Sequence, residues 1–263
     1  MLWLRYLACV VVIGCGAGAR AQQMYMTGFP GEALPPEMLG FSTPGYGVEV
    51  GAGVCSLSKD QGVTTGTASV RLCRWVDGDF AAQVTADRSA GAQTGSTGLI
   101  VWYPGASYSN IFFFEGGTIA GNIFQSGAGS RTIGSAAAMA NFRIRRTGQD
   151  MTLEFDDGSG WTTLHSSSSP ALLGPVRAGF FSVEERSMAP GATFAFDDFA
   201  VEADVLAECY ADCDCSVSLD LFDFLCFQNS FAAGDRYADC DGTGVLDFID
   251  FLCVQNGFAA GCL

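Results

Sequence analysis

Residues 141–161 read NFRIRRTGQDMTLEFDDGSGW. At the start of this stretch Phe142, Ile144 and Arg146 alternate with polar or charged neighbours, which is the period of a strand with one buried face. A second alternating run follows, and an Asp-Gly turn signal then precedes Trp161, as is typical of a β-hairpin. The stretch therefore predicts adjacent antiparallel strands that cover a core with one face.

Runs of the same kind recur on both sides of this stretch, between about residue 45 and residue 203. They are short, and glycine- or proline-containing turns separate them, so a sandwich or barrel of many strands is expected. The predicted strands cover residues 68–75, 80–86, 98–103, 110–114, 142–146, 151–155, 176–182 and 193–201.

Four short motifs in this half occur in a fixed order. They are Arg143-Ile-Arg145, Asp157-Gly-Ser-Gly-Trp161, Gly174-Pro-Val-Arg-Ala-Gly179 and Phe196-Asp-Asp-Phe199. In this order they resemble the concanavalin A-like, laminin-G-like jelly rolls over residues 45–205. The resemblance implies a mainly β jelly-roll sandwich. Members of that fold commonly bind glycans, and some hydrolyse them.

The C-terminal part holds an internal repeat. Residues 212–223 read DCDCSVSLDLFD, and residues 239–250 read DCDGTGVLDFID. Residues 210–234 and 237–261 are identical at 17 of 25 positions, at an offset of 27 residues. With seven cysteines in its last 55 residues, the chain is expected to carry a separate C-terminal module over residues 206–263, which consists of two loop–helix units.

Each repeat has the ligand spacing of an EF-hand loop, with carboxylates at positions 1, 3, 9 and 12. Two Ca²⁺ sites are therefore expected, and a helix should begin near Asp247. The second site should be the stronger, because Gly244 permits the sharp turn at position 6 where the first repeat has Val217. The expected ligands are Asp212, Asp214, Ser216, Ser218, Asp220 and Asp223 in the first loop, and Asp239, Asp241, Thr243, Val245, Asp247 and Asp250 in the second.

Two such loop–helix units, each ending in Asp and set 27 residues apart, resemble dockerin-type repeats. The resemblance implies a calcium-stabilised module that can attach the chain to a protein partner. Dockerins usually present small hydroxyl residues at loop positions 10 and 11. This sequence has Leu221-Phe222 and Phe248-Ile249 there, which can pack on each other, on the β domain or on a different partner.

The N-terminus reads as a targeting segment. Arg5 precedes a short apolar run, and Ala19 and Ala21 have the spacing of a signal-peptidase site, so residues 1–21 are expected to be a signal peptide. The alternative is a lipoprotein acylated at Cys15. Residues 22–44 are expected to form an irregular leader or edge. Since no later segment reads as transmembrane, the protein is predicted to be secreted or held in the cell envelope.

Nine cysteines remain after the signal segment, and an exported chain with that many is expected to form disulfides. Cys55 is expected to pair with Cys73 between neighbouring strands. Cys209 and Cys262 can tie the ends of the C-terminal module, which leaves Cys215 unpaired. Bonds within each repeat and crossed bonds between repeats are both open for Cys213, Cys226, Cys240 and Cys253.

The chain is strongly acidic, with a formal net charge of −15. Residues 206–263 contribute ten acidic residues and a single arginine. This balance argues against nucleic acid or an anionic membrane as a partner, and it favours the binding of cations.

No catalytic constellation is recognisable, so the protein is not expected to be an enzyme. The single histidine, His165, lies in a serine-rich run without a nucleophile-elbow motif, and Glu154 starts an acid pattern that is not completed. Three aromatic residues give a stronger indication of function. Trp102, Tyr103 and Tyr108 flank a turn, where their rings could stack on sugar rings. The expected function is a non-catalytic, glycan-binding sandwich with a calcium-stabilised tail. The alternatives are an extracellular glycoside hydrolase and a structural envelope protein.

Overall fold

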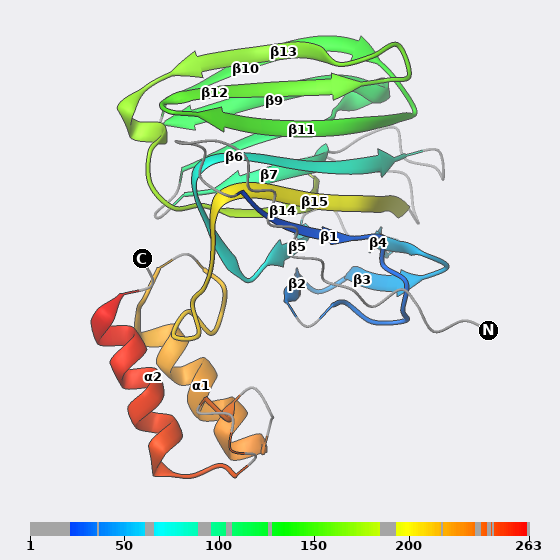
Figure 1. The fold of residues 1–263 in the computed structure, drawn as a ribbon. Coiled ribbons are helices and arrows are strands. Elements are labelled where there is room, and N and C mark those ends of the chain that lie inside the picture. Colours follow the sequence, from blue (N-terminus) through cyan, green and yellow to red (C-terminus); the bar gives the residue numbers. More distant parts are fainter. Residues whose placement is uncertain are drawn as a thin grey trace, which may run out of the picture.

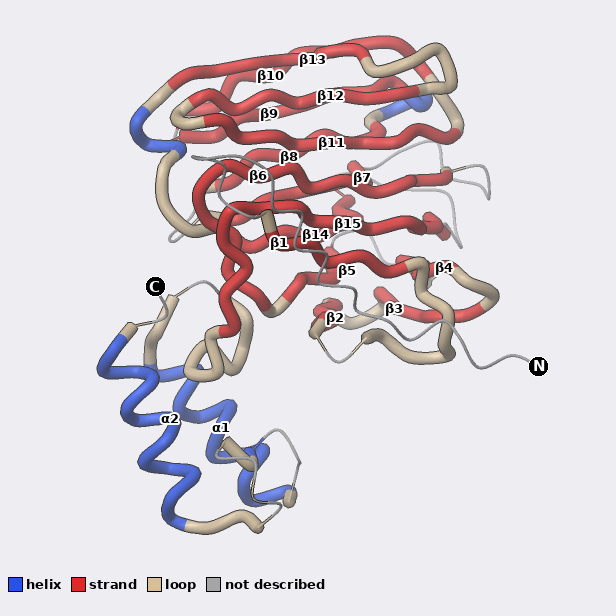
Figure 2. The backbone as a smooth tube through the Cα atoms, in the orientation of Figure 1, coloured by secondary structure: helices blue, strands red, loops and turns tan. Residues whose placement is uncertain are grey.

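A computed structural model describes residues 22–261 except 36, 61–65, 89–95, 104–106, 126–127, 185–192, 217, 235–237, 241–242 and 244. Two antiparallel sheets lie face to face, and two helices extend from one end of them (Figures 1 and 2). The predicted fold class, a mainly β jelly-roll sandwich with a small helical C-terminal module, is confirmed. The expected signal peptide and Cys15 lie outside the described residues.

The larger sheet has the strand order β13-β12-β11-β6-β15-β4-β3, and β1 also pairs with β15. The smaller sheet has the order β10-β9-β8-β7-β14-β5-β2. In chain order the strands are β1 Gln23–Thr27, β2 Met38–Ser42, β3 Tyr46–Gly51, β4 Val54–Lys59, β5 Gly66–Leu72, β6 Arg74–Asp87, β7 Ser96–Trp102, β8 Tyr108–Phe113, β9 Thr118–Gln125, β10 Ala128–Ala136, β11 Met139–Thr147, β12 Asp150–Asp156, β13 Thr162–Ser168, β14 Arg177–Glu184 and β15 Thr193–Glu208. Short 3₁₀ turns span Glu115–Gly117 and Pro170–Leu172.

The core between the sheets is rich in phenylalanine. Phe180 of β14 stacks on Phe196 of β15 with ring centroids 4.4 Å apart, which joins the centres of the two sheets. Phe29 and Phe199 meet Phe180 edge-on, with centroid distances of 5.8 and 5.7 Å. All four rings are fully or almost fully buried, so the alternating apolar positions of the strands form one continuous core.

Arg146 lies on the buried face of β11, as the alternation of the sequence places it, and only 1% of its surface is exposed. Its Nε donates to the carbonyl of Gly78 at 2.8 Å, and Nη1 donates to the carbonyl of Leu172 at 2.9 Å and to that of Gly174. Nη2 pairs with a carboxylate oxygen of Asp77 at 2.9 Å. The guanidinium thus joins two loops to the end of the sheet.

Residues 22–44 differ from the irregular segment that was expected, because they contribute β1 and β2. Strand β15 also runs on to Glu208, so the expected short joint after residue 205 is the end of a strand. Its last residues pair with β6 from Asp77 to Arg74. The first residues of the tail, defined here as residues 206–263, are therefore held in the larger sheet.

The tail continues into α1, Leu221–Ala233, and α2, Phe248–Ala260, which lie antiparallel (Figure 1). Both begin with the same capping box, in which an Asp at the N-cap and an Asp three residues later exchange hydrogen bonds with each other's backbone. The expected helix start near Asp247 is confirmed. Phe251 packs against Phe227 and Phe231 at centroid distances of 5.0 and 4.8 Å, which holds the helices together.

Neither α1 nor α2, nor any other described helical segment, has the length and apolar character that crossing a bilayer requires.

Candidate metal-binding loops and their joint with the sandwich

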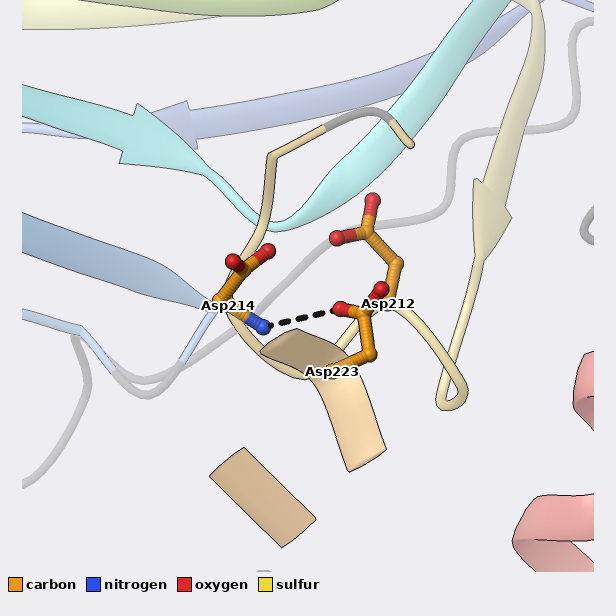
Figure 3. Close-up of side chains that lie close together, drawn as sticks. All are labelled: Asp212, Asp214 and Asp223. Atoms are coloured by element: carbon orange, nitrogen blue, oxygen red, sulfur yellow. Dashed lines mark hydrogen bonds between the residues drawn. The ribbon is translucent and has the colours of Figure 1, made fainter. Parts of the chain in front are cut away.

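The first acidic loop, loop 1, comprises residues 212–223. Carboxylate oxygens of Asp212, Asp214 and Asp223 all lie within 4.8 Å of one another (Figure 3). These are positions 1, 3 and 12 of the predicted calcium loop. Because Asp212 and Asp223 are buried and Asp214 is half-buried, three negative charges are gathered where little water screens them.

Hydrogen bonds from the loop's own backbone orient these carboxylates. The amide of Ser216 donates to Oδ1 of Asp212 at 2.8 Å and to Oδ1 of Asp214 at 3.0 Å. Asp223 accepts from the amides of Asp214 at 3.3 Å and Asp220 at 2.9 Å. The expected position 9 ligand, Asp220, is exposed and caps α1 by accepting from Phe222. The loop therefore curls around positions 1, 3 and 12.

Burial above all, together with the neighbouring charges of Asp214 and Asp212, raises the pKa of Asp223 to about 6 against the lowering effect of the two backbone hydrogen bonds. The ionised form of this carboxyl is thus disfavoured in the metal-free loop. A divalent cation among the three carboxylates would reverse that effect, because it stabilises the charged forms. The donor set consists of hard oxygens, so it fits Ca²⁺.

The second acidic loop, loop 2, comprises residues 239–250 and repeats part of the hydrogen bonding of loop 1. In both loops the Asp at position 12 accepts from the amide at position 9, whereas its second donor is the position 3 amide in loop 1 and the position 2 amide in loop 2. Asp250 is fully buried and accepts from the amides of Cys240 and Asp247, both at 2.8 Å. Asp247 caps α2 by accepting from Ile249 at 2.7 Å. Position 3 of this loop, Asp241, lies outside the described residues, so the convergence of its three acids is not described.

Positions 5 and 7 are also equivalent in the two loops. Ser216 Oγ donates to the carbonyl of Ser218 at 3.1 Å, and Thr243 Oγ1 donates to the carbonyl of Val245 at 3.4 Å. In both repeats a hydroxyl and a carbonyl of the predicted ligand set are therefore neighbours. Asp239, at position 1 of loop 2, is half-buried.

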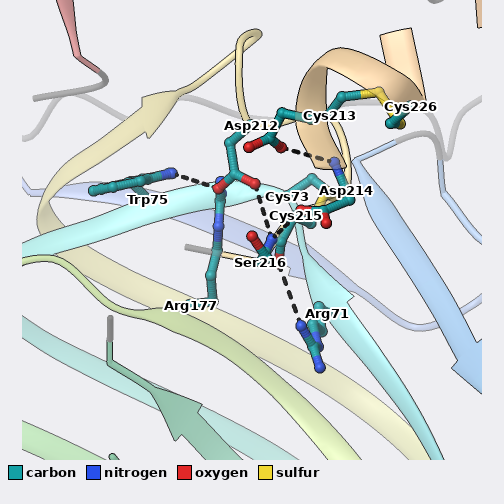
Figure 4. Close-up of a disulfide and its surroundings, with 11 residues drawn as sticks. Arg71, Cys73, Trp75, Arg177, Asp212, Cys213, Asp214, Cys215, Ser216 and Cys226 are labelled. Atoms are coloured by element: carbon teal, nitrogen blue, oxygen red, sulfur yellow. Dashed lines mark hydrogen bonds and ion pairs between the residues drawn. A yellow bond between two sulfur atoms is a disulfide. The ribbon is translucent and has the colours of Figure 1, made fainter. Parts of the chain in front are cut away.

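Loop 1 is fixed to the sandwich as well as to α1. Oδ2 of Asp212 accepts from the indole Nε1 of Trp75 at 3.0 Å and forms an ion pair with Arg177, whose side chain is fully buried like that of Asp212 (Figure 4). Arg71 Nη1 donates to the carbonyl of Cys215 at 3.5 Å. None of these three sandwich residues was among the sequence-based candidates. No local motif marks them, since they lie 35 or more residues from their partners.

A disulfide between Cys73 and Cys215 crosses the same joint, over a sequence separation of 142 residues (Figure 4). The expected Cys55–Cys73 bond and the expected unpaired Cys215 are therefore both wrong. Cys55 lies on β4 in the larger sheet, is free and buried, and burial raises the pKa of its thiol to about 12. Cys73 follows β5 of the smaller sheet and faces the tail, so strands that are near in sequence lie in different layers.

The four cysteines that are equivalent between the two repeats pair within their own repeat. Cys213 bonds Cys226, and Cys240 bonds Cys253. Of the two arrangements left open by the sequence, the structure thus has the intra-repeat one. Cys209 is disulfide-bonded as well, but Cys262 lies outside the described residues, so a bond between those two remains a prediction.

A cleft of about 540 Å³ lies along this joint. Residues of both parts line it, among them Glu37 and Arg74 of the sandwich and Tyr210, Asp214 and Ser230 of the tail. Since Asp214 belongs to the carboxylate cluster, the cleft gives dissolved ions a route to loop 1.

The three aromatic candidates for sugar stacking lie in different surroundings. Tyr103 is a core residue, only 5% exposed, with a phenol pKa raised to about 12 by burial, so its predicted place at an exposed rim is wrong. Trp102 is half-buried at the end of β7, where a side chain at Gly179 would collide with its ring, and the Arg71 guanidinium covers the ring 4.6 Å from its centroid. Tyr108 is half-buried at the start of β8.

The apolar pairs at the helix starts are exposed. Leu221 and Phe222 are 67% and 66% exposed, and Phe248 and Ile249 are 70% and 51% exposed. They therefore pack neither on each other nor on the sandwich.

Comparison with protein-family models finds no match for this chain, and comparison with curated proteins finds none either. Solved structures do share its fold. An uncharacterized protein from Mycobacterium paratuberculosis matches with a TM-score of 0.55 and 10% identity, over 67% of this chain and 98% of the other. A glycoside hydrolase family protein from Mycobacterium thermorestibile matches with a TM-score of 0.51 and 11% identity, over 67% of this chain and 98% of the other.

A GH43 protein from Bacillus licheniformis matches with a TM-score of 0.50 and 14% identity, over 68% of this chain. The match covers only 39% of that longer protein. At such identities the similarities show a shared fold of the sandwich and nothing finer.

Proposed function

We propose that the chain is an exported, non-catalytic binding protein. Its sandwich binds a carbohydrate, and its tail is a dockerin-like, calcium-stabilised module that attaches the protein to a partner. The observation that carries the calcium part is the convergence of three carboxylates in loop 1 at the positions that the repeat predicts. The expected ligands are the twelve residues named for the two loops, with loop 2 as the stronger site.

Calcium would neutralise the clustered carboxylates of the tail and so stabilise its folded form. Each repeat is small and has one intra-repeat disulfide, and a module of this size buries little core of its own. A cation that binds only the folded loops adds stability by mass action. Calcium is favoured over magnesium, because magnesium seldom uses a cage made of protein oxygens alone.

The carbohydrate part of the proposal is supported by the fold. Proteins with the same sandwich include one described as a glycoside hydrolase family protein. Of the three aromatic candidates, Tyr108 retains partial exposure outside the core, so it is the residue most suited to stack on a sugar ring.

The non-catalytic part is supported by the surroundings of the acids that the sequence singles out. Glu154 pairs with Arg143 at 2.7 Å and with Arg145 at 3.4 Å. Asp156 accepts from the amides of Gly158 and Gly160, both at 2.9 Å, and so orders a turn. These carboxylates have structural partners, whereas glycoside hydrolysis needs two acids directed at one bond.

Attachment through the tail is supported by its exposed apolar pairs, Leu221-Phe222 and Phe248-Ile249, which lie beside the exposed carboxylates of Asp220 and Asp247. A partner would need an apolar surface that is bordered by basic side chains. The hydroxyl residues of dockerins are absent at these positions, so a partner of a different kind from theirs is expected.

A glycan array with the intact chain tests the sugar-binding part. We expect binding to at least one glycan class, and Tyr108→Ala should weaken it about fivefold, since an aromatic contact contributes on the order of 1 kcal/mol. Trp161→Ala is the matched control, because that ring is exposed at another turn and the Arg143 guanidinium covers it at 3.8 Å.

Three other outcomes would change the proposal. Release of reducing sugar from mixed polysaccharides would favour the hydrolase. Absence of both binding and release would favour a structural envelope protein. If Tyr108→Ala bound like the unaltered chain, the aromatic assignment would be incorrect even if the sandwich binds glycans.

A further inference from the structure

Loop 1 already has a cation beside its carboxylates. The Arg177 guanidinium, on β14 of the sandwich, pairs with the carboxylate of Asp212, and both side chains are fully buried. The same carboxylate oxygen accepts from the indole of Trp75 at 3.0 Å. Asp212 is position 1 of the predicted calcium loop. Arg177 and Trp75 of the sandwich therefore already contact a carboxylate oxygen that a metal ion in this loop would use.

A second arginine faces the same loop. Arg71 lies on β5 in register with Gly179 of β14, so it comes from the strand next to that of Arg177. Its guanidinium lies between the rings of Phe41 and Trp102, at 4.5 and 4.6 Å from their centroids, and it donates to the Cys215 carbonyl at 3.5 Å. Burial lowers the pKa of Arg71, while the charges of Asp214 and Asp212 act in the opposite direction.

The backbone of loop 1 is adapted to this contact. Cys215 adopts a left-handed conformation with φ of 54°, which is unfavourable for a residue other than glycine. Its disulfide to Cys73 holds that conformation against the sandwich. Loop 2 stands at the opposite end of the tail, where α2 begins far from the sheets (Figures 1 and 2).

We propose that Arg177 acts as a built-in cation of loop 1, so that loop 1 is chiefly a docking loop whose folded form does not require a metal. Calcium then binds loop 1 less tightly than it would without Arg177. This inference rests on the proposed calcium function. It specifies Arg177 as the residue that makes the calcium affinity of loop 1 lower than that of loop 2.

Two physical effects of Arg177 oppose each other. By holding the Asp212 carboxylate it could orient a ligand and tighten calcium binding. A positive charge on that carboxylate also repels an incoming divalent cation and withdraws negative charge from the site. The ion pair is buried, so its charges are poorly screened, and we expect the repulsion to be the larger effect. The cleft beside Asp214 leaves the loop accessible, so access does not explain a weaker site.

Hydrogen exchange on the unaltered, oxidised chain tests the proposal without a mutation. The amide of Ser216 reports on loop 1, and the amides of Cys240 and Asp247 report on loop 2. On addition of EDTA we expect faster exchange at the loop 2 amides and little change at Ser216. Equal loss of protection in both loops would overturn the proposal. If calcium and EDTA gave identical exchange in both loops, the proposed calcium function itself would fail.

Calcium titration of variants tests the direction of the effect. In an Asp250→Asn background, which disables loop 2, Arg177→Met should tighten calcium binding by about tenfold or more, or ~1.4 kcal/mol. Arg177→Lys keeps the charge and should stay near the background value. Arg145→Met is the control, because that arginine is 49% exposed and pairs with Glu154 of the sandwich.

The disulfide makes folding of the variants checkable, since an intact joint leaves Cys73 and Cys215 unreactive to thiol reagents. Weaker or unchanged calcium binding in correctly folded Arg177→Met would overturn the proposal and assign Arg177 the orienting role. If Arg177→Met failed to fold, the exchange experiment on the unaltered chain would still decide the proposal.

Discussion

In EDTA, the tail of the intact, oxidised chain should melt about 15 °C or more below its melting temperature in millimolar calcium. A ligand at a thousandfold excess over its Kd stabilises the folded form by about 4 kcal/mol. Each kcal/mol shifts the melting temperature of a domain this small by about 4–8 °C. The sandwich transition should move much less, because its core of stacked phenylalanines contains no predicted metal ligand.

Differential scanning calorimetry is the measurement, with magnesium in place of calcium as the control. Magnesium should restore only a small part of the shift. Identical thermograms with and without chelator would contradict the assignment of metal to the tail. An equal shift of both transitions would show instead that the sandwich depends on the metal, which the structure gives no reason to expect.

Arg146→Met should destabilise the sandwich by about 3–5 kcal/mol, because it removes a buried, charged donor from three carbonyl groups, and a hydrogen bond to a charged group contributes about 1.5–3 kcal/mol. Methionine fits the space of the arginine stem. It leaves Asp77 without its cation and removes the donor from the carbonyls of Gly78, Leu172 and Gly174. The loops that carry these groups would then lose their attachment to β11.

Urea unfolding followed by tryptophan fluorescence measures this effect. The matched control is Arg145→Met on the adjacent position of the same strand. Its side chain is 49% exposed, and its partner Glu154, which is buried, keeps the closer ion pair with Arg143 at 2.7 Å. Loss of such a longer pair with an exposed arginine costs about 1 kcal/mol or less. If Arg146→Met unfolded at the same urea concentration as the control, Arg146 would not hold the two loops as described.

The sequence predicts well where a pattern is local and regular. The alternation in residues 142–146 correctly places Phe142, Ile144 and Arg146 on the buried face of β11. The repeat register predicts the start of α2 near Asp247, because the acidic loop and the helix start that follows it span only a dozen residues. The sequence patterns do not predict β9 and β10. The apolar positions of β9 are interrupted at Gly121 and Asn122, and β10 consists mostly of small and polar residues, so neither has a clear apolar period.

The joint could not be predicted, because its partners are distant in the chain and carry no shared motif. Cys73 and Cys215 are 142 residues apart, and Arg177 and Asp212 are 35 residues apart. Two observations in the sequence nevertheless point to it. Loop 1 has a cysteine at a position where loop 2 has a glycine, and the acidic tail contains almost no basic residues to balance its charge.

The central claim is that the tail binds calcium through the carboxylates of its loops. Isothermal titration of the decalcified intact chain with calcium tests it directly. We predict saturable binding with a tightest Kd of about 10⁻⁵ M or lower, and loss of that tightest site in Asp250→Asn. Heats indistinguishable from dilution into buffer, in both the unaltered chain and the variant, would contradict the claim.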